Sequence, residues 1–239
     1  MRVVSLVPSW TEFLHDLDVQ VVGQTKFCVR PRHAFREVPR IGGTKTVHVE
    51  TVLDLKPDLV VANREENERL QVEQLEEALG ANAVCVTDIR TVRAALQAIT
   101  RVGARVDRIR DANEMAQRIE DAWGEPVEPR GEAGYAVWAS PWMIAGHDTY
   151  IHDVMRHWGI RNIPTPVEST ERYPTLGDSF EEGASASRTW LLPSEPFPFG
   201  QKHLDGFQSN HPRTNFLLVD GEAFSWYGSR MLHVTQHLR

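Results

Sequence analysis

Short uninterrupted apolar runs alternate with longer amphipathic segments along most of this chain. Leu59–Ala62 is a run of four apolar residues, and Ala83–Val86 is a second run of the same kind. A strand that is apolar on both faces must be covered on both faces, which favours a parallel sheet flanked by helices. The charged segment 65–79 between these runs has helical spacing, with Leu70 among the residues predicted on its buried side. The pattern therefore predicts an α/β fold.

The alternation is interrupted once and then resumes, which predicts two α/β halves. Residues 91–123 contain no strand pattern, and Gly103 is predicted to separate a first helix from a longer one, Ala104–Trp123. Breaker residues at 124–131 follow this helix. The predicted domains are an N-terminal lobe at 1–103, a bridging helix and joint at 104–131, and a C-terminal lobe at 132–239. A closing helix is predicted over 224–238.

Composition excludes several classes of function. The 239 residues carry a net charge of −7, whereas a nucleic-acid-binding domain has a basic face. No stretch approaches the roughly 20 apolar residues of a membrane span, so we expect no insertion into a membrane. The apolar run Val3–Val7 is too short for the core of a secretory signal. We expect a cytoplasmic protein if Met1 is the native start, and a periplasmic or otherwise extracytoplasmic one if a signal peptide was removed.

Motifs that would mark a catalytic or metal centre are missing from the sequence. There is no Gly-x-Ser-x-Gly, phosphate-loop or dinucleotide-binding glycine pattern, and neither Cys-x-x-Cys nor His-Glu-x-x-His occurs. His147, His152 and His157 recur every five residues, which does not put all three on one face of a helix. We therefore predict a protein without catalytic residues, without a required cofactor and without a metal site of its own.

Several segments, in order, resemble a known family. They are Val3–Ser9 with Thr11 and Glu12, Arg40–Gly43, Leu55–Val60, Gly146 with Asp148–Asp153, Ser194–Phe199 and Phe224–Arg230. Each is weak alone, but their order and spacing are similar to the class III substrate-binding proteins of ABC transporters. That family binds cobalamin, ferric siderophores or metal ions, and the chain is most similar to its cobalamin-binding-like branch.

The resemblance implies a fold and a function. It implies two Rossmann-like lobes with parallel sheets, bridged by one long backbone helix. It implies a monomer that holds a corrinoid or metal chelate, such as cobalamin or a ferric chelate, in the cleft between the lobes. An ABC transporter permease is the implied partner if the protein is exported. Glu68 and Glu195 are the nearest matches to the acidic residues that dock the permease in relatives.

Two tryptophans are the first candidates for ligand contact. Trp10 follows the first strand of the first half, and Trp142 follows the first strand of the second half. Ligands of parallel α/β folds bind beyond the carboxyl ends of strands, and flat ligands stack on aromatic rings. We therefore expect Trp10 and Trp142 to face each other across a cleft. The alternative is that both rings are packed in the core.

The other candidates also follow predicted strands or open predicted helices. They are Phe27, Cys28, Thr44, Lys45, Asn63, Arg64, Glu65, His147, Trp226 and Arg230. The alternative for Cys28 is an unreactive thiol. The alternative for residues 63–65 is an ordinary charged first turn of a helix. His147 is the best single histidine to touch ligand. For the last two residues the alternative is that Trp226 and Tyr227 seal the second lobe while Arg230 pairs with an internal carboxylate.

Two other classes of function stay open from the residues alone. An enzyme of corrinoid or metal-chelate salvage would use the same cleft, with Glu12, Cys28, Glu65 and His147 as acid–base or nucleophilic groups. A protein-interaction module would use the charged face of 65–77, although a charge run is usually a solvated face.

Overall fold

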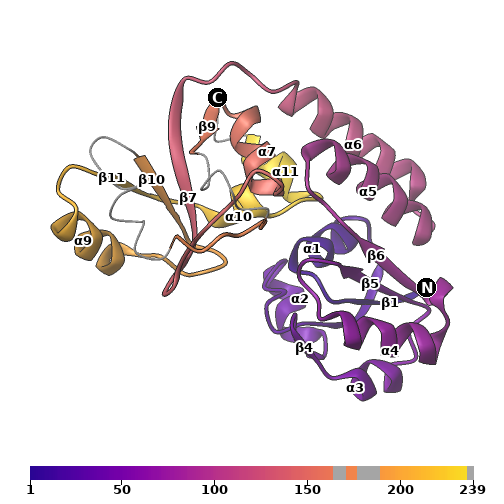
Figure 1. Ribbon diagram of the computed structural model, residues 1–239. Coiled ribbons are helices and arrows are strands. Elements are labelled where there is room, and N and C mark those ends of the chain that lie inside the picture. Colours follow the sequence, from indigo (N-terminus) through magenta and orange to yellow (C-terminus); the bar gives the residue numbers. More distant parts are fainter. Residues whose placement is uncertain (164–170, 177–188, 236–239) are drawn as a thin grey trace. The chain divides into compact units, whose positions relative to one another are not determined.

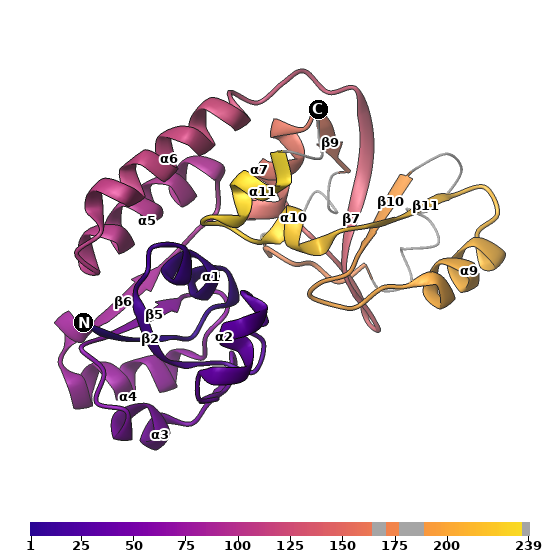
Figure 2. The same ribbon diagram turned by 180° about the vertical axis from the view of Figure 1, so that it is seen from behind.

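The chain folds into two compact units, each with its own sheet (Figures 1 and 2). The computed structural model describes residues 1–163, 171–176 and 189–235. The first unit contains Met1–Ile89, Arg93–Ala122 and the segment that begins at Trp226, and the second contains Arg90–Val92 and Trp123–Ser225. No helix in the described ranges is long and apolar enough to cross a membrane.

The first unit has a four-stranded parallel sheet in the order β2-β1-β5-β6. Its strands are β1 (Arg2–Ser5), β2 (Gln20–Gln24), β5 (Leu59–Asn63) and β6 (Val84–Thr87). Every residue of β5 is buried, as its apolar run predicts. Around the sheet are α1 (Pro8–Asp16), α2 (Arg32–Glu37), α3 (Val49–Asp54), α4 (Arg69–Leu79), the short turn η1 (Ala81–Ala83) and the small β3 (Gly42–Gly43) and β4 (Thr46–Val47) ribbon.

Helix α4 begins later than the predicted 65–79, at Arg69, because residues 63–67 form a hydrogen-bonded turn. Val72 and Leu75 are the buried residues of this helix, and Leu70 is 67% exposed. At 100° per residue, Leu70 lies roughly opposite Val72, so its predicted place on the buried side was wrong.

Residues 92–123 form two helices that lie side by side, α5 (Val92–Arg105) and α6 (Ile109–Trp123) (Figures 1 and 2). Gly103, the predicted divider, lies inside α5, where the missing side chain lets Ala112 of α6 approach its backbone. The chain reverses just after it, with Asp107 at φ 58°. Nearly all of both helices group with the first unit, so the predicted bridging segment beginning at Ala104 does not match their boundaries.

The second unit has a mainly parallel sheet in which β11, β10, β7 and β9 run in the same direction. Its strands are β7 (Gly131–Ala139), β8 (Trp142–Ile144), β9 (Ile160–Asn162), β10 (Thr189–Pro193) and β11 (Asn215–Val219), with β8 antiparallel to β7. Its helices are α7 (Tyr150–His157), α9 (Gln201–Asn210) and α10 (Gly221–Ser225). Aromatic side chains fill the core, and the Trp190 ring lies directly on Gly134, where no Cβ would fit.

The predicted closing helix is broken into α10 and α11 (Arg230–Thr235), with Gly228 between them at φ 77°. The predicted end at Leu238 lies outside the described residues. After α10 the chain returns to the first unit, where the Tyr227 ring lies 4.9 Å from that of Trp10. The Arg230 guanidinium donates two hydrogen bonds to the Glu12 carboxylate, and the Tyr227 hydroxyl donates to Glu66 at 2.9 Å. The segment that begins at Trp226, named the return segment below, is therefore held by an ion pair as well as by aromatic contact.

The Glu12–Arg230 pair supplies a test of this packing. The two side chains are 8% and 14% exposed, so removing one leaves a poorly solvated charge. We expect Arg230→Met to lower the free energy of unfolding by about 3–5 kcal/mol, measured by urea denaturation followed by circular dichroism. The double variant Glu12→Met with Arg230→Met should recover most of that loss. Equal destabilisation in the single and double variants would contradict the ion-pair account.

Candidate functional site

A buried hydrogen-bond network joins the loops at the carboxyl edge of the first sheet. The Asn67 side chain accepts from the Asn63 N–H at 2.8 Å and donates to the carbonyls of Leu6 and Thr44, both at 3.1 Å. These carbonyls follow β1 and β3. One buried side-chain amide therefore fixes three loops, and no local sequence pattern predicts this role for Asn67.

Trp10 belongs to the same network and not to a ligand surface. Its side chain is 0% exposed, its indole N–H donates to Thr87 Oγ1 at 3.0 Å, and its ring lies between those of Phe13 and Tyr227. The prediction that Trp10 stacks on a ligand was wrong, because α1 begins at Pro8 and turns this ring inward. Asn63 is 2% exposed and also donates to Thr87 Oγ1, so it shapes the loop from beneath.

Phe27 is the aromatic side chain that this edge presents to solvent. It is 50% exposed, and the Lys26 ammonium lies 5.1 Å from its ring centroid. Gly43 lets both side chains approach, because a Cβ there would lie 3.3 Å from the Phe27 ring and 3.4 Å from Lys26 Cε. An exposed ring beside a cation can receive a flat, anionic group.

The neighbouring loops add charged groups to this surface. The Lys45 ammonium is exposed and donates to the Glu65 carbonyl at 2.6 Å. Arg64 is also exposed and lies 3.7 Å from Asp88. Thr44 is half-buried, and its carbonyl accepts a hydrogen bond from the Asn67 side chain. We name Lys26, Phe27, Lys45, Arg64 and Glu65 the Phe27 surface.

Cys28, next to this surface, is a buried thiol. It is 0% exposed and takes part in hydrogen bonds with the hydroxyls of Thr11 and Thr25 at 3.0 and 3.1 Å. Burial raises the pKa of the Cys28 thiol, which disfavours the thiolate that binds metals or attacks electrophiles. The expectation that Cys28 contacts ligand is contradicted by this burial, and the structure agrees with the alternative of an unreactive thiol.

The side chains of the return segment pack inside the protein and do not form a ligand surface. Trp226 is 5% exposed, and Arg230 is held by Glu12. The expectation that they contact ligand is contradicted, because both are committed to packing. The alternative interpretation correctly predicted that Arg230 pairs with an internal carboxylate. It wrongly predicted that Trp226 and Tyr227 seal the second lobe, because both residues belong to the first unit.

In the second unit, Trp142 lies in the hydrophobic core. It is 7% exposed and contacts the rings of Trp190, Phe199 and Phe207, so the prediction that it lines a cleft was also wrong. The exposed tryptophan is Trp138, near the end of β7. It is 42% exposed and packs edge-on against Phe197, with ring centroids 5.1 Å apart. Alternation along β7 could not have found it, because Trp138 lies two residues beyond the buried Ala136 and would be assigned to the same face.

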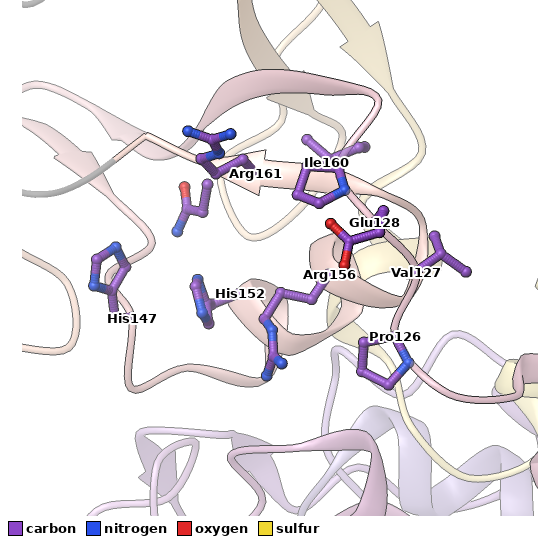
Figure 3. Close-up of a pocket in the computed structure, with 10 residues that line it drawn as sticks. Pro126, Val127, Glu128, His147, His152, Arg156, Ile160 and Arg161 are labelled. Atoms are coloured by element: carbon purple, nitrogen blue, oxygen red, sulfur yellow. The ribbon is translucent and has the colours of Figure 1, made fainter.

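The capping turn of α7 brings two histidines together at a pocket of about 570 Å³ (Figure 3). Thr149 caps the helix by accepting from the His152 N–H at 3.2 Å, which sets His147 beside the first turn. The two imidazole centroids are 4.9 Å apart. Burial, followed by the charges of His147 and Arg156, lowers the pKa of His152. The five-residue spacing did not predict that His147 and His152 lie together, because His147 lies before the helix and the helical periodicity does not apply to it.

The two predicted docking glutamates differ in exposure. Glu68 is exposed at the start of α4. Glu195 is half-buried, and its backbone packs closely against Gly221, while its charge contributes to raising the pKa of Tyr135 after the larger effect of burial. The Glu68 side chain is therefore exposed, whereas Glu195 is constrained by the packing around it.

Two parallel-sheet units with a C-terminal segment that returns to the first define an α/β binding protein. The family model for periplasmic binding proteins matches residues 3–214. The chain therefore belongs to the periplasmic binding protein family, as the sequence resemblance predicted.

Named relatives agree with this membership. The vitamin B12-binding protein of Salmonella typhi is 28% identical over 182 residues, which are 72% of this chain and 67% of that protein. Among solved structures, the periplasmic heme-binding protein BhuT has a TM-score of 0.76 at 22% identity, over 100% of this chain and 96% of its own. The periplasmic vitamin B12-binding protein BtuF of Vibrio cholerae has a TM-score of 0.75 at 15% identity, over 99% and 94%. The structural likeness shows the fold.

Asn67 offers a test of how the first sheet's edge is built. Asn67→Ala removes three buried hydrogen bonds, and we expect it to lower the free energy of unfolding by about 2–4 kcal/mol. Asn113→Ala is the matched control, because the exposed Asn113 side chain on α6 accepts one hydrogen bond, from the Thr100 hydroxyl, within the described residues. Its cost should stay under about 0.5 kcal/mol. Equal values for the two variants in urea denaturation would contradict the anchoring role.

Proposed function

We propose that the protein is a receptor for a corrinoid or another flat metal chelate, and that the Phe27 surface is part of its binding site. The chelate is cargo in this proposal, and the protein needs no resident cofactor. The observation that carries it is an exposed aromatic ring beside cations, at the carboxyl edge of a parallel sheet, in a chain of the periplasmic binding protein family.

The named relatives support the choice of ligand class. Their names record vitamin B12 in one group and heme in another, and both are flat macrocyclic metal chelates. A flat macrocycle gains buried apolar area against a ring, and anionic groups that it carries, such as the carboxylates of heme or the phosphate of cobalamin, gain from nearby ammonium and guanidinium groups. Lys26, Lys45 and Arg64 supply such groups although the whole chain carries a charge of −7.

Trp138 and Phe197 make a second aromatic surface, on the other unit. We propose this pair as a separate candidate contact for a chelate, within the second unit alone. It takes the place of Trp142 as the aromatic candidate of this unit, because Trp142 is buried against Trp190 and Phe207. The proposal is for binding without turnover, so cobalamin or hemin recovered after incubation should have an unchanged mass spectrum.

Aromatic truncation tests the proposed surfaces. We expect Phe27→Ala and Trp138→Ala each to weaken cobalamin or hemin binding about tenfold, because each variant loses ring contact and buried apolar area worth roughly 1–2 kcal/mol. Calorimetry or an absorption titration measures the Kd. Leu70→Ala is the control, since Leu70 is 67% exposed on α4.

The outcomes separate the alternatives. Unchanged affinity in both aromatic variants would contradict the proposed surfaces. Failure of the wild-type protein to bind either chelate would contradict the ligand class. Chemical change of the chelate over time would support the salvage-enzyme alternative instead.

We further propose that the protein works outside the cytoplasm and delivers its ligand to an ABC transporter permease, as its family implies. Glu68 is the proposed docking residue, because its carboxylate is exposed at the start of α4. Glu195 remains a proposed second one, but its packed backbone makes it a poor test.

Charge reversal tests the docking proposal. Glu68→Lys should reduce uptake of labelled cobalamin by the host at least about fivefold while the Kd of the purified protein is unchanged, because an interface charge is reversed without touching the ligand. Glu77→Lys, on the same helix and also exposed, should leave uptake near the wild-type value. Normal uptake with Glu68→Lys would contradict this role.

A further inference from the structure

We propose that His147 and His152 form a site for a divalent transition-metal ion in the pocket of the second unit. The pocket is bordered by the capping turn and first turns of α7, by β9 and by the segment 126–129 (Figure 3). Its position and residues differ from those of the Phe27 surface, so this inference stands apart from the proposed chelate site.

The separation of the two imidazoles fits one shared ion. Metal–nitrogen distances of about 2.0–2.1 Å put an ion roughly 3.2 Å from each ring centroid, so two imidazoles on a tetrahedral or octahedral ion lie about 4.5–5.2 Å apart. The observed separation is 4.9 Å. His15 and His33 form another ring pair, but at 6.2 Å they would require an angle at the metal of about 150°.

The surroundings of the pair are those of a ligand-ready site. His152 Nδ1 is buried without a hydrogen-bond partner in the described part of the chain, so this ring nitrogen is available to an ion. Asn162 Nδ2 donates to the Ala145 carbonyl, while its buried Oδ1 lacks a partner in the same described part. A hydrated ion carries donors that such an oxygen can accept.

Nearby cations do not oppose an ion as strongly as their number suggests. Arg156 lies 3.2 Å from Asp153, and Arg161 lies 2.9 Å from Glu132, so each is paired with a carboxylate. Glu128 also lines the pocket. Within the described ranges no group of three His, Cys, Asp or Glu residues is arranged around a metal, so the ion would complete its shell with water. Imidazole favours Co²⁺, Ni²⁺, Cu²⁺ or Zn²⁺ over Mg²⁺ or Ca²⁺.

Titration of the tag-free, full-length protein with Co²⁺, in the absence of any chelate, tests the site. We expect visible d–d absorption that saturates at one equivalent, and displacement of Co²⁺ by Zn²⁺. His147→Ala and His152→Ala should each weaken Co²⁺ binding at least about tenfold. The double variant His15→Ala with His33→Ala is the matched control and should bind Co²⁺ as the wild type does.

Three results would overturn the proposal. They are the absence of a Co²⁺ signal up to 1 mM metal, unchanged binding in both His147→Ala and His152→Ala, and an equal loss in the control pair. His147 is exposed, so its variant decides the question even if His152→Ala disturbs folding. Phe27→Ala should retain Co²⁺ binding, which separates failure of this site from failure of the proposed chelate surface.

Discussion

The buried side-chain amide of Asn67 is the constraint on which the first unit's candidate site depends. It accepts from the Asn63 N–H and donates to the carbonyls of Leu6 and Thr44. The nearby Thr87 hydroxyl accepts from the Trp10 and Asn63 side chains. Each loop would otherwise bury an unpaired polar group, which is costly. With the loops fixed from beneath, the Lys26 and Phe27 side chains can stay exposed above Gly43 without losing their position.

The architecture could be predicted because its signals are local. Uninterrupted apolar runs such as Leu59–Ala62 need cover on both faces, and the strands Leu59–Asn63 and Val84–Thr87 lie within one residue of the two predicted runs. The predictions that were wrong concern breaks within helices. Asp107 reverses the chain within the predicted long helix, and Gly228 divides the predicted closing helix. Both depend on tertiary packing, which a sequence pattern does not record.

The candidate site was harder to predict, because exposure of a ring depends on residues distant in sequence. Trp10 follows a strand as a ligand-binding residue should, but Tyr227 covers it. Trp142 follows a strand in the same way, and Phe199 and Phe207 enclose it. Phe27 and Lys45 follow strands by the same rule, and both are exposed in the structure. The receptor interpretation therefore rests on family membership and on Phe27, and no longer on paired tryptophans.

Hydrogen–deuterium exchange on the intact protein, with and without saturating cobalamin or hemin, tests the central claim most directly. Ligand bound at the Phe27 surface should slow exchange in peptides covering residues 25–30 and 43–46, while the exposed face of α4 exchanges as before. Ligand binding without protection of either peptide would contradict the assignment of this edge as the binding surface.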